Sequence, residues 1–250
     1  MYFKNFVSLF FVILITSGCA KVTSIRHVAG YNNNMIQPKE ILILPPQVEV
    51  YTLDISSRKE RMYNYEDHLE ELIRREIPLA IQENGFRVKL LHRRDIRDQK
   101  LDNVVSRLRD SYNSAHKTLY IPLLWEESKA FSITQNVGEA AVTLGQQTNS
   151  DILLLIDYAQ IIKTNGARAR DFAMSLIFNN SSVTENADNS VLAVGIVDTK
   201  TGNILWTNMS STSQDLYSCA ISNFSSRDKV EIANLHKLIK AILMPLRNKN

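Results

Sequence analysis

The side chains best suited to chemistry are widely spaced in this 250-residue chain. The five histidines are His27, His68, His92, His116 and His236. No two of them stand at the spacing that a metal-binding helix or hairpin uses, so we interpret each as a surface or half-buried residue and expect no metal site. The adjacent carboxylates Glu126 and Glu127 would point to opposite faces of a strand, which argues against a paired acid–base site.

The sequence gives no more support for nucleophilic catalysis than for a metal site. The chain contains no GxSxG sequence, no glycine-rich phosphate loop and only eight glycines. Cys219 and His236 would form a nucleophile and its base only if the fold brought them together. We favour a buried thiol for Cys219, because an unpaired cysteine behaves as a small apolar side chain. We therefore expect no catalytic residues, no enzyme activity and no cofactor.

A basic cluster lies between residues 87 and 100. Its members are Arg87, Lys89, Arg93, Arg94, Arg97 and Lys100. Nucleic acid, anionic lipid or an acidic protein could bind such a cluster. Asp95 and Asp98 interrupt it, and it holds no aromatic residue on which a base could stack. The net charge of the whole chain is only +3, so a solvated face is the first interpretation and an acidic protein partner the second.

The amino-terminal segment predicts where the protein resides. Residues 6–15 are apolar except for Ser8; they follow the cation Lys4 and precede three small residues at 16–18. About ten apolar residues are too few for a helix that crosses a bilayer, which needs roughly 20. A positive start, a short apolar core and small residues before a cleavage point are instead typical of a secretory signal peptide.

The sequence Thr16-Ser17-Gly18-Cys19 resembles the lipobox of bacterial lipoproteins. The resemblance implies cleavage before Cys19 and lipidation of Cys19 with acyl chains such as palmitate. Because Ala20 follows rather than aspartate, it also implies transport to the outer membrane, with the protein on the periplasmic side. Each buried methylene contributes about 0.8 kcal/mol, so several acyl chains would hold the protein firmly. Two alternatives remain open, an incidental Cys19 after an ordinary signal peptide and an uncleaved anchor.

We expect three parts in the chain. Residues 1–18 are the predicted signal peptide, residues 19–38 a tether with few core-forming side chains, and residues 39–250 a single domain. The hydrophobic fraction of 44% and the charged fraction of 22% are ordinary for a globular domain. Residues 111–136 fit no clear period, so we interpret them as an irregular insertion that covers the core; an insertion that packs against a partner is the second interpretation.

Hydrophobic periodicity predicts the elements of the domain. Expected strands cover residues 41–46, 86–91, 151–163, 168–178, 190–197 and 203–209. Expected helices cover residues 64–85, a stretch around 101–108, residues 137–147 and an amphipathic segment over 225–247. In the first helix we expect Asn64 as N-cap, a kink or break near Ile77 because of Pro78, and a left-handed Gly85 after the last turn.

The order of these elements predicts an α/β (α+β) domain with a mixed sheet of about five to six strands and flanking helices. The strands over 168–178, 190–197 and 203–209 are expected to form an antiparallel meander, with a polar loop over 179–190 and a turn at 198–202.

Four stretches in sequence carry a resemblance to a known fold. They read ILILPP at 41–46, ENGFRV at 83–88, SDILLLIDY at 150–158 and VGIVDTKTGNILW at 194–206. In this order they are similar to the amino-terminal domain of TolB and to lipoproteins that reuse its fold, including the curli secretion channel lipoprotein. The resemblance covers roughly residues 39–213. It implies an envelope protein that binds other proteins, often in a ring or an assembly, without catalysis.

The sequence thus predicts a non-catalytic, lipid-anchored adaptor or assembly factor for an envelope transport or secretion complex. Its expected partners are membrane lipid, envelope proteins and other copies of itself, and not nucleic acid. The alternative is an oligomeric, channel-forming secretion subunit. Strands of a membrane barrel alternate apolar and polar residues over about ten positions, whereas residues 174–178 and 191–197 are mostly continuous apolar runs, which suit a buried sheet better. An enzyme is the third possibility.

Overall fold

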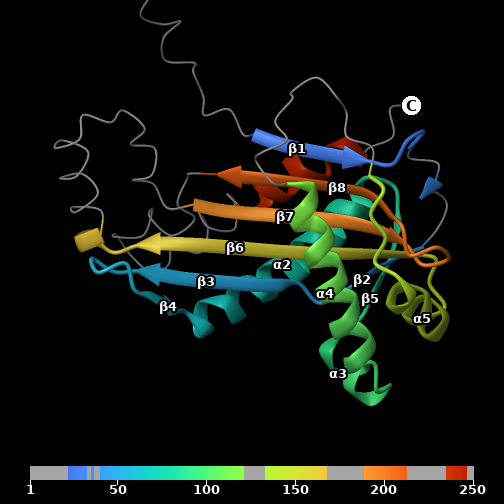
Figure 1. Ribbon diagram of the computed structural model, residues 1–250, viewed down its shortest axis with the longest axis horizontal. Helices are drawn as coiled ribbons and strands as arrows, with labels where there is room; N and C mark the ends of the chain where they lie inside the picture. Colours follow the sequence, from blue (N-terminus) through green and yellow to red (C-terminus); the bar gives the residue numbers. More distant parts are fainter. Residues whose placement is uncertain are drawn as a thin grey trace, which may run out of the picture.

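The structure is a computed structural model that describes residues 22–32, 35–36, 40–120, 133–167, 189–212 and 235–246. These residues form a mixed α/β fold in which helices pack on both faces of one mixed sheet (Figure 1). The predicted fold class is confirmed. The sheet is larger than predicted, with eight strands in the described part of the chain.

The strands follow the chain in a simple series. They are β1 (Val22–His27), β2 (Glu40–Ile43), β3 (Gln47–Leu53), β4 (Lys59–Arg61), β5 (Arg87–Leu90), β6 (Ile152–Lys163), β7 (Asn189–Asp198) and β8 (Ile204–Thr212). Across the sheet their order is β1-β8-β7-β6-β2-β5, while β3 pairs with β6 beyond the end of β2 and β4 pairs with β3. Strand β7 is antiparallel to both β6 and β8, which confirms the antiparallel pairing predicted for residues 190–197 and 203–209.

The helices are α2 (Tyr63–Glu83), α3 (Arg93–Asp98), α4 (Asp102–Leu119) and α5 (Glu139–Thr148). Residues 235–243 are also helical and lead into the short 3-10 helix η4 (Met244–Leu246). Helix α4 crosses one face of the sheet and α2 covers the other (Figure 1). Among the described residues, no helix combines the length and the apolar content that spanning a bilayer requires.

Strand β6 lies between the two hydrophobic cores. Leu153 and Leu155 pack with α4 and α5, whereas Ile152, Leu154 and Ile156 pack with α2 and the helix over residues 235–243. Successive side chains of a strand point to opposite faces, so a strand covered on both faces needs an unbroken apolar run. The sequence ILLLI meets this need, and all five of these side chains are fully buried.

Helix α2 departs from the prediction at two positions. It begins at Tyr63 after Met62, so Asn64 lies inside the helix and is not the N-cap. It also continues through Pro78 to Glu83, so the predicted break is wrong. Proline removes one backbone hydrogen bond, but the apolar face of α2 is buried against the sheet both before and after Pro78, which holds the helix together. Gly85 has the predicted left-handed backbone, with φ of 89°.

The predicted tether is wrong for residues 22–27, because these residues form β1. Strand β1 pairs antiparallel with β8 from Val22 opposite Ser211 to His27 opposite Trp206. Its sequence, VTSIRH, holds few apolar residues, since backbone hydrogen bonds to β8 rather than core side chains fix this strand at the edge of the sheet. Ile36, also in the predicted tether, is fully buried in the core.

The predicted irregular segment over 111–136 is also partly wrong. Helix α4 continues to Leu119, and its side chains Tyr112 and Ala115 are buried. Residues 121–132, the predicted strand over 168–178 and the first part of the predicted helix over 225–247 lie outside the described residues. The described part of that last helix, residues 235–243, is helical as predicted.

A bulge joins β2 to β3. Both strands pair with β6 in parallel, from Ile41–Ile43 opposite Ile152–Leu154 and then from Gln47 opposite Asp157. Three residues, 44–46, therefore stand opposite two, 155 and 156. Pro45 and Pro46 cannot donate backbone hydrogen bonds, so the ladder is interrupted at this point.

Arg109 of α4 bridges this interruption. Its Nη2 donates to the carbonyl oxygen of Pro45 at 2.5 Å, and its Nη1 donates to the carboxylate of Asp157 at 2.9 Å and to the carbonyl oxygen of Ile156 at 3.3 Å. The Arg109 side chain is 11% exposed and that of Asp157 is 24% exposed. Burial raises the pKa of the Asp157 carboxyl, and the neighbouring charge of Arg109 opposes that shift. We call this set the Arg109 bridge.

Replacing Arg109 by methionine should lower the free energy of unfolding by about 3 kcal/mol. This is the low end of the cost of breaking a buried ion pair, because Asp157 keeps some contact with water. Arg107→Met is the matched control, since Arg107 is exposed on the same helix and should change stability by less than about 0.5 kcal/mol. Denaturant unfolding of both variants measures the difference, and equal stabilities would contradict the role of the bridge.

Candidate functional site

Several residues considered from the sequence lie outside the described residues. They are Cys19, Cys219, Glu126 and Glu127. Lipidation at Cys19 and burial of the Cys219 thiol therefore stay predictions.

The five histidines lie on different elements. His68 and His92 are exposed, while His27, His116 and His236 are half-buried, which agrees with the predicted surface or half-buried positions. His236 Nδ1 is 3.2 Å from the Glu76 carboxylate on α2. Among the described residues, no group of three histidine, cysteine, aspartate or glutamate side chains is arranged to hold a metal ion.

Several residues of the basic cluster form hydrogen bonds or ion pairs with other residues of the chain. Arg93 donates two hydrogen bonds to Glu70 at 2.9 and 2.7 Å, and Lys89 Nζ donates to the carbonyl oxygen of Thr148 at 2.8 Å. Arg94 pairs with Asp98 at 3.4 Å. These internal partners favour the first interpretation, a solvated face, over a binding site.

A column of aromatic side chains on α4 fastens β1 to the rest of the fold. Tyr112, His116 and Tyr120 follow one another at four-residue steps, with ring centroids 5.7 and 4.5 Å apart. The Tyr120 hydroxyl donates to the carbonyl oxygen of Ser24 on β1 at 2.8 Å, and the Arg26 guanidinium lies 5.6 Å from the centre of the Tyr120 ring. Burial raises the pKa of Tyr120 to about 12, so its hydroxyl keeps the proton that it donates.

The inner end of this column requires a glycine in the sheet. Tyr112 lies over Gly195 of β7 so closely that a Cβ atom at position 195 would be 2.1 Å from the tyrosine hydroxyl oxygen. The turn predicted at residues 198–202 does not require a glycine at position 195, because Gly195 lies within strand β7. This column was not predicted, although the sequence places its three rings four residues apart, a spacing that puts them on one face of a helix.

His116 occupies the middle of the column without a polar partner. Its Nε2 atom is buried and has no hydrogen-bond partner among the described residues. Burial lowers the pKa of His116 to about 4. The histidine is therefore neutral at ordinary pH and serves as a packing group between two tyrosines.

Two hollows on the described surface are small or shallow. One, beside Pro45, Pro46 and His92 at the end of β2, has a volume of about 10 Å³, which is room for about one water molecule. The other is an open depression between α4 and residues 135–136, lined by Asp110, Ser114 and Thr118 among others. Neither has the enclosed, mostly apolar form of a small-molecule site.

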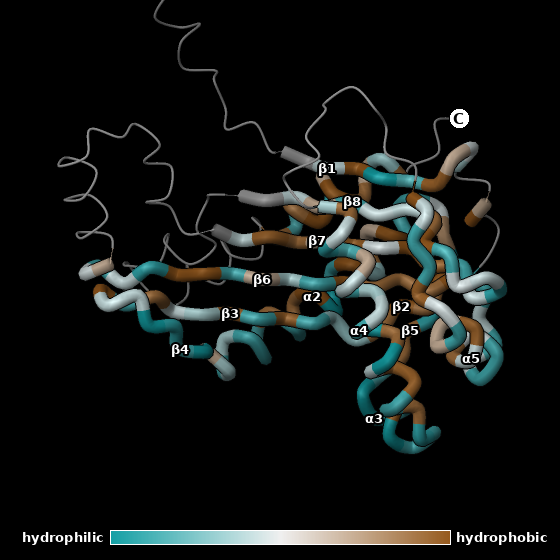
Figure 2. The backbone as a smooth tube through the Cα atoms, in the orientation of Figure 1, coloured by the Kyte–Doolittle hydropathy of each residue, from teal (hydrophilic) through white to brown (hydrophobic). Residues whose placement is uncertain are grey.

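The remaining candidate is a surface at one end of the sheet. Strand β6 ends there at Lys163 and the β3–β4 hairpin turns there, while β1 runs away from this end and starts level with Ala159 of β6 (Figure 1). We call it the hairpin end; the opposite end, which holds the turn between β7 and β8, is the turn end. Strand β4 is hydrophilic along its length (Figure 2).

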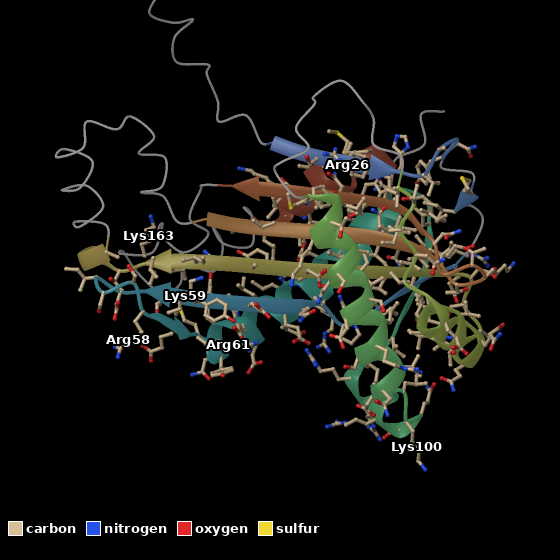
Figure 3. The ribbon with its side chains drawn as sticks, viewed as in Figure 1. Arg26, Arg58, Lys59, Arg61, Lys100 and Lys163 are labelled. Atoms are coloured by element: carbon tan, nitrogen blue, oxygen red, sulfur yellow. The ribbon has the colours of Figure 1, made fainter. Side chains whose placement is uncertain are left out.

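Cations gather at the hairpin end (Figure 3). They are Arg58, Lys59, Arg61 and Lys163. The sheet register sets Lys59 opposite Leu53 and Leu53 opposite Lys163, so the two lysines flank Leu53 on one face. Ile55, at the tip of the hairpin, is 60% exposed.

The acidic groups of the hairpin neutralise part of this charge. Arg61 donates to the buried carboxylate of Glu66 at 2.8 Å, and its guanidinium lies 5.1 Å from the centre of the Tyr63 ring. Arg58 pairs with Asp54 at 3.3 Å, but with 79% of the Arg58 side chain exposed this pair contributes little. Lys59 is exposed, as is Glu60 next to it. Arg58 and Lys59 are thus the cations that most readily reach an anionic surface.

Comparison with known proteins finds a distant structural likeness. No protein-family model matches the chain, and no curated protein matches it. One matching solved structure is a PelC dodecamer from Paraburkholderia phytofirmans, with 8% identity, a TM-score of 0.41 and coverage of 92% of this chain and 99% of that chain. A PelC variant dodecamer from the same organism matches with 8% identity, a TM-score of 0.39 and coverage of 91% and 98%. Likeness at this level assigns neither an activity nor an assembly to this chain.

Replacing His116 by phenylalanine should flatten the dependence of stability on acid pH. Between pH 6.5 and about 4 the unfolded chain binds a proton at His116 that the folded chain does not. The free energy of unfolding therefore falls as the pH falls through this window, by about 3 kcal/mol for this one group. His116→Phe removes that share of the loss.

Unfolding free energies of the wild type and of His116→Phe at several pH values measure the effect. His68→Gln is the control, because it removes an exposed imidazole and leaves the buried column intact. Parallel profiles for the wild type and His116→Phe would rule out a buried neutral histidine.

Proposed function

We propose that the chain is a lipid-anchored, non-catalytic protein on the periplasmic side of the outer membrane. It serves there as an adaptor or assembly factor for an envelope transport or secretion complex. The observation that carries the proposal is the position of Cys19, which follows a lipobox-like sequence and stands three residues before the first strand of the fold.

The fold is compatible with cleavage before Cys19. A cut at that point leaves every described strand and helix intact, because the first of them, β1, begins at Val22. Acylated Cys19 would then be the new amino terminus and would hold the domain at the membrane. Several acyl chains hold a protein stably at a membrane, whereas a single chain binds only marginally.

The adaptor role in the proposal depends on the outer surfaces of the protein and not on a cavity. Both faces of the sheet carry helices, and the two hollows described above do not have the form of a small-molecule site. Partners would contact the outer surfaces of the helices and the ends and edges of the sheet. The resemblance to TolB-like lipoproteins, carried by the stretches quoted above, points in the same direction.

A channel-forming, oligomeric subunit is the second candidate. The feature of the fold that suggests it is β1. This strand lies at one end of the strand order and, among the described strands, pairs with β8 alone. The distal half of β6 argues against a membrane strand, because its polar residue Gln160 is buried between Tyr158 and Ile162 on the face that packs into the core.

Cys19→Ala should release the protein from the membrane. In the wild type, intact mass should give a chain that begins at Cys19 and carries acyl mass, and fractionation should find it with outer membranes. The variant should lose the acyl mass, the cleavage and the membrane association. Identical behaviour of both proteins would mean that Cys19 is incidental and would overturn the proposal.

Crosslinking in intact envelopes should separate the two candidates. An adaptor is expected to be captured with other envelope proteins, and a channel subunit with copies of itself, in detergent-extracted particles that conduct ions. Monomeric chains without any crosslinked partner would contradict both.

A further inference from the structure

We propose that the hairpin end of the sheet faces the bilayer and that Ile55, Arg58 and Lys59 contact anionic phospholipid headgroups. This inference rests on the proposed acylation of Cys19. It adds an orientation of the domain and a lipid-contacting surface to the proposed function.

The first argument is the length of chain between lipid and fold. Only Ala20 and Lys21 separate Cys19 from Val22, where β1 begins. Three residue steps span at most about 11 Å. An anchored Cys19 therefore holds the start of β1 within about 11 Å of the membrane interface, whereas a tether of twenty residues would leave the orientation free.

The second argument is the register of the sheet. Val22 of β1 lies opposite Ser211 of β8, and Ser211 lies opposite Val191 of β7. Val191 in turn pairs with Ala159 of β6, four residues before Lys163. The start of β1 therefore lies level with Ala159, nearer the hairpin end of β6 than the turn end, because Ala159 is four positions from Lys163 and seven from Ile152.

The β3–β4 hairpin extends this end. Leu53 pairs with Lys163 on one side and with Lys59 on the other, so residues 54–58 form the turn just beyond. In contrast, Lys200 lies in the β7–β8 turn at the other end of β6. Twelve residues of extended strand separate the two ends by about 36 Å.

The third argument is the chemistry of the hairpin tip. Ile55 exposes 60% of its surface next to two exposed cations, Arg58 and Lys59. An apolar side chain beside basic residues suits the interface between headgroups and acyl chains. Cations close to an anionic membrane surface are attracted to it and strengthen the attachment.

The acidic residues of the hairpin limit this attraction. Asp54 accepts hydrogen bonds from the backbone N–H groups of Ser56 and Arg58 at 2.8 and 2.9 Å, so its carboxylate is engaged within its own turn. Glu60 is exposed and offsets one cation. The tip therefore supplies orientation, and the acyl chains supply the affinity.

Fluorescence quenching from the lipid surface tests the orientation. The full chain with Cys219→Ser carries a single fluorophore, at Ile55→Cys or at Lys200→Cys, and is reconstituted after acylation into vesicles of phosphatidylethanolamine and phosphatidylglycerol. Lys200 is the matched control, because its side chain is 68% exposed and lies at the turn end. Headgroup-attached nitroxide should quench the fluorophore at position 55 several-fold more than the one at position 200.

The same samples separate the possible failures. A chain without acyl mass that does not float with vesicles overturns the proposed function, and with it this inference. An acylated, floating chain with equal quenching at both positions, or stronger quenching at position 200, overturns the orientation alone.

Charge reversal tests the lipid contact itself. Lys59→Glu should lower quenching at position 55 in vesicles that contain phosphatidylglycerol and have little effect in vesicles of phosphatidylethanolamine alone. Arg107→Glu is the control, since Arg107 is exposed on α4, away from the hairpin. If Lys59→Glu changes nothing in either vesicle, the headgroup contact is refuted. If the cations at this tip bind an acidic protein partner instead of lipid, Lys59→Glu will have no effect in these protein-free vesicles.

Discussion

Arg109 holds together the part of the sheet that backbone hydrogen bonding leaves open. The two prolines between β2 and β3 interrupt pairing with β6, and the guanidinium spans the gap by binding Pro45, Ile156 and Asp157 at once. Strand β3 therefore continues along β6 after the bulge, and β4 and the hairpin tip follow from its register. The same contacts fix α4 across the sheet, so that Tyr112, His116 and Tyr120 reach β7 and β1.

The surface of the molecule follows from this arrangement. Helices occupy both faces of the sheet, so the two ends and the edge strands remain for contacts outside the chain. The ends differ in character. The turn end joins β7 to β8 through a tight turn, whereas the hairpin end combines exposed cations with the apolar Ile55 and is the end nearer the start of β1. A lipid anchor attached to β1 would act on this second end, which links the proposed location to a specific surface.

Elements with strong hydrophobic periodicity were predictable. Strand β6, the β7–β8 meander and helices α2, α4 and α5 lie where the sequence predicts them, because burial of one or both faces imposes a regular pattern on their residues. Strands β1, β3 and β4 were missed. Backbone pairing and polar contacts hold β1 and β4 at the margins of the sheet, so their side chains carry little pattern. Helix α2 continues through Pro78 because tertiary packing outweighs the loss of one hydrogen bond.

The sequence by itself determined the fold class, most of the central elements and the resemblance around Cys19, since local patterns of apolar and small residues encode these features. The tertiary structure alone decided that residues 22–27 join the sheet, that Arg109 closes the proline bulge, and that a neutral His116 lies between two tyrosines. It also brought the end of β6 and the tip of the β3–β4 hairpin together, and set the start of β1 nearer this end of the sheet than the turn end. These are relations between residues far apart in the chain, and only strand register and packing establish them.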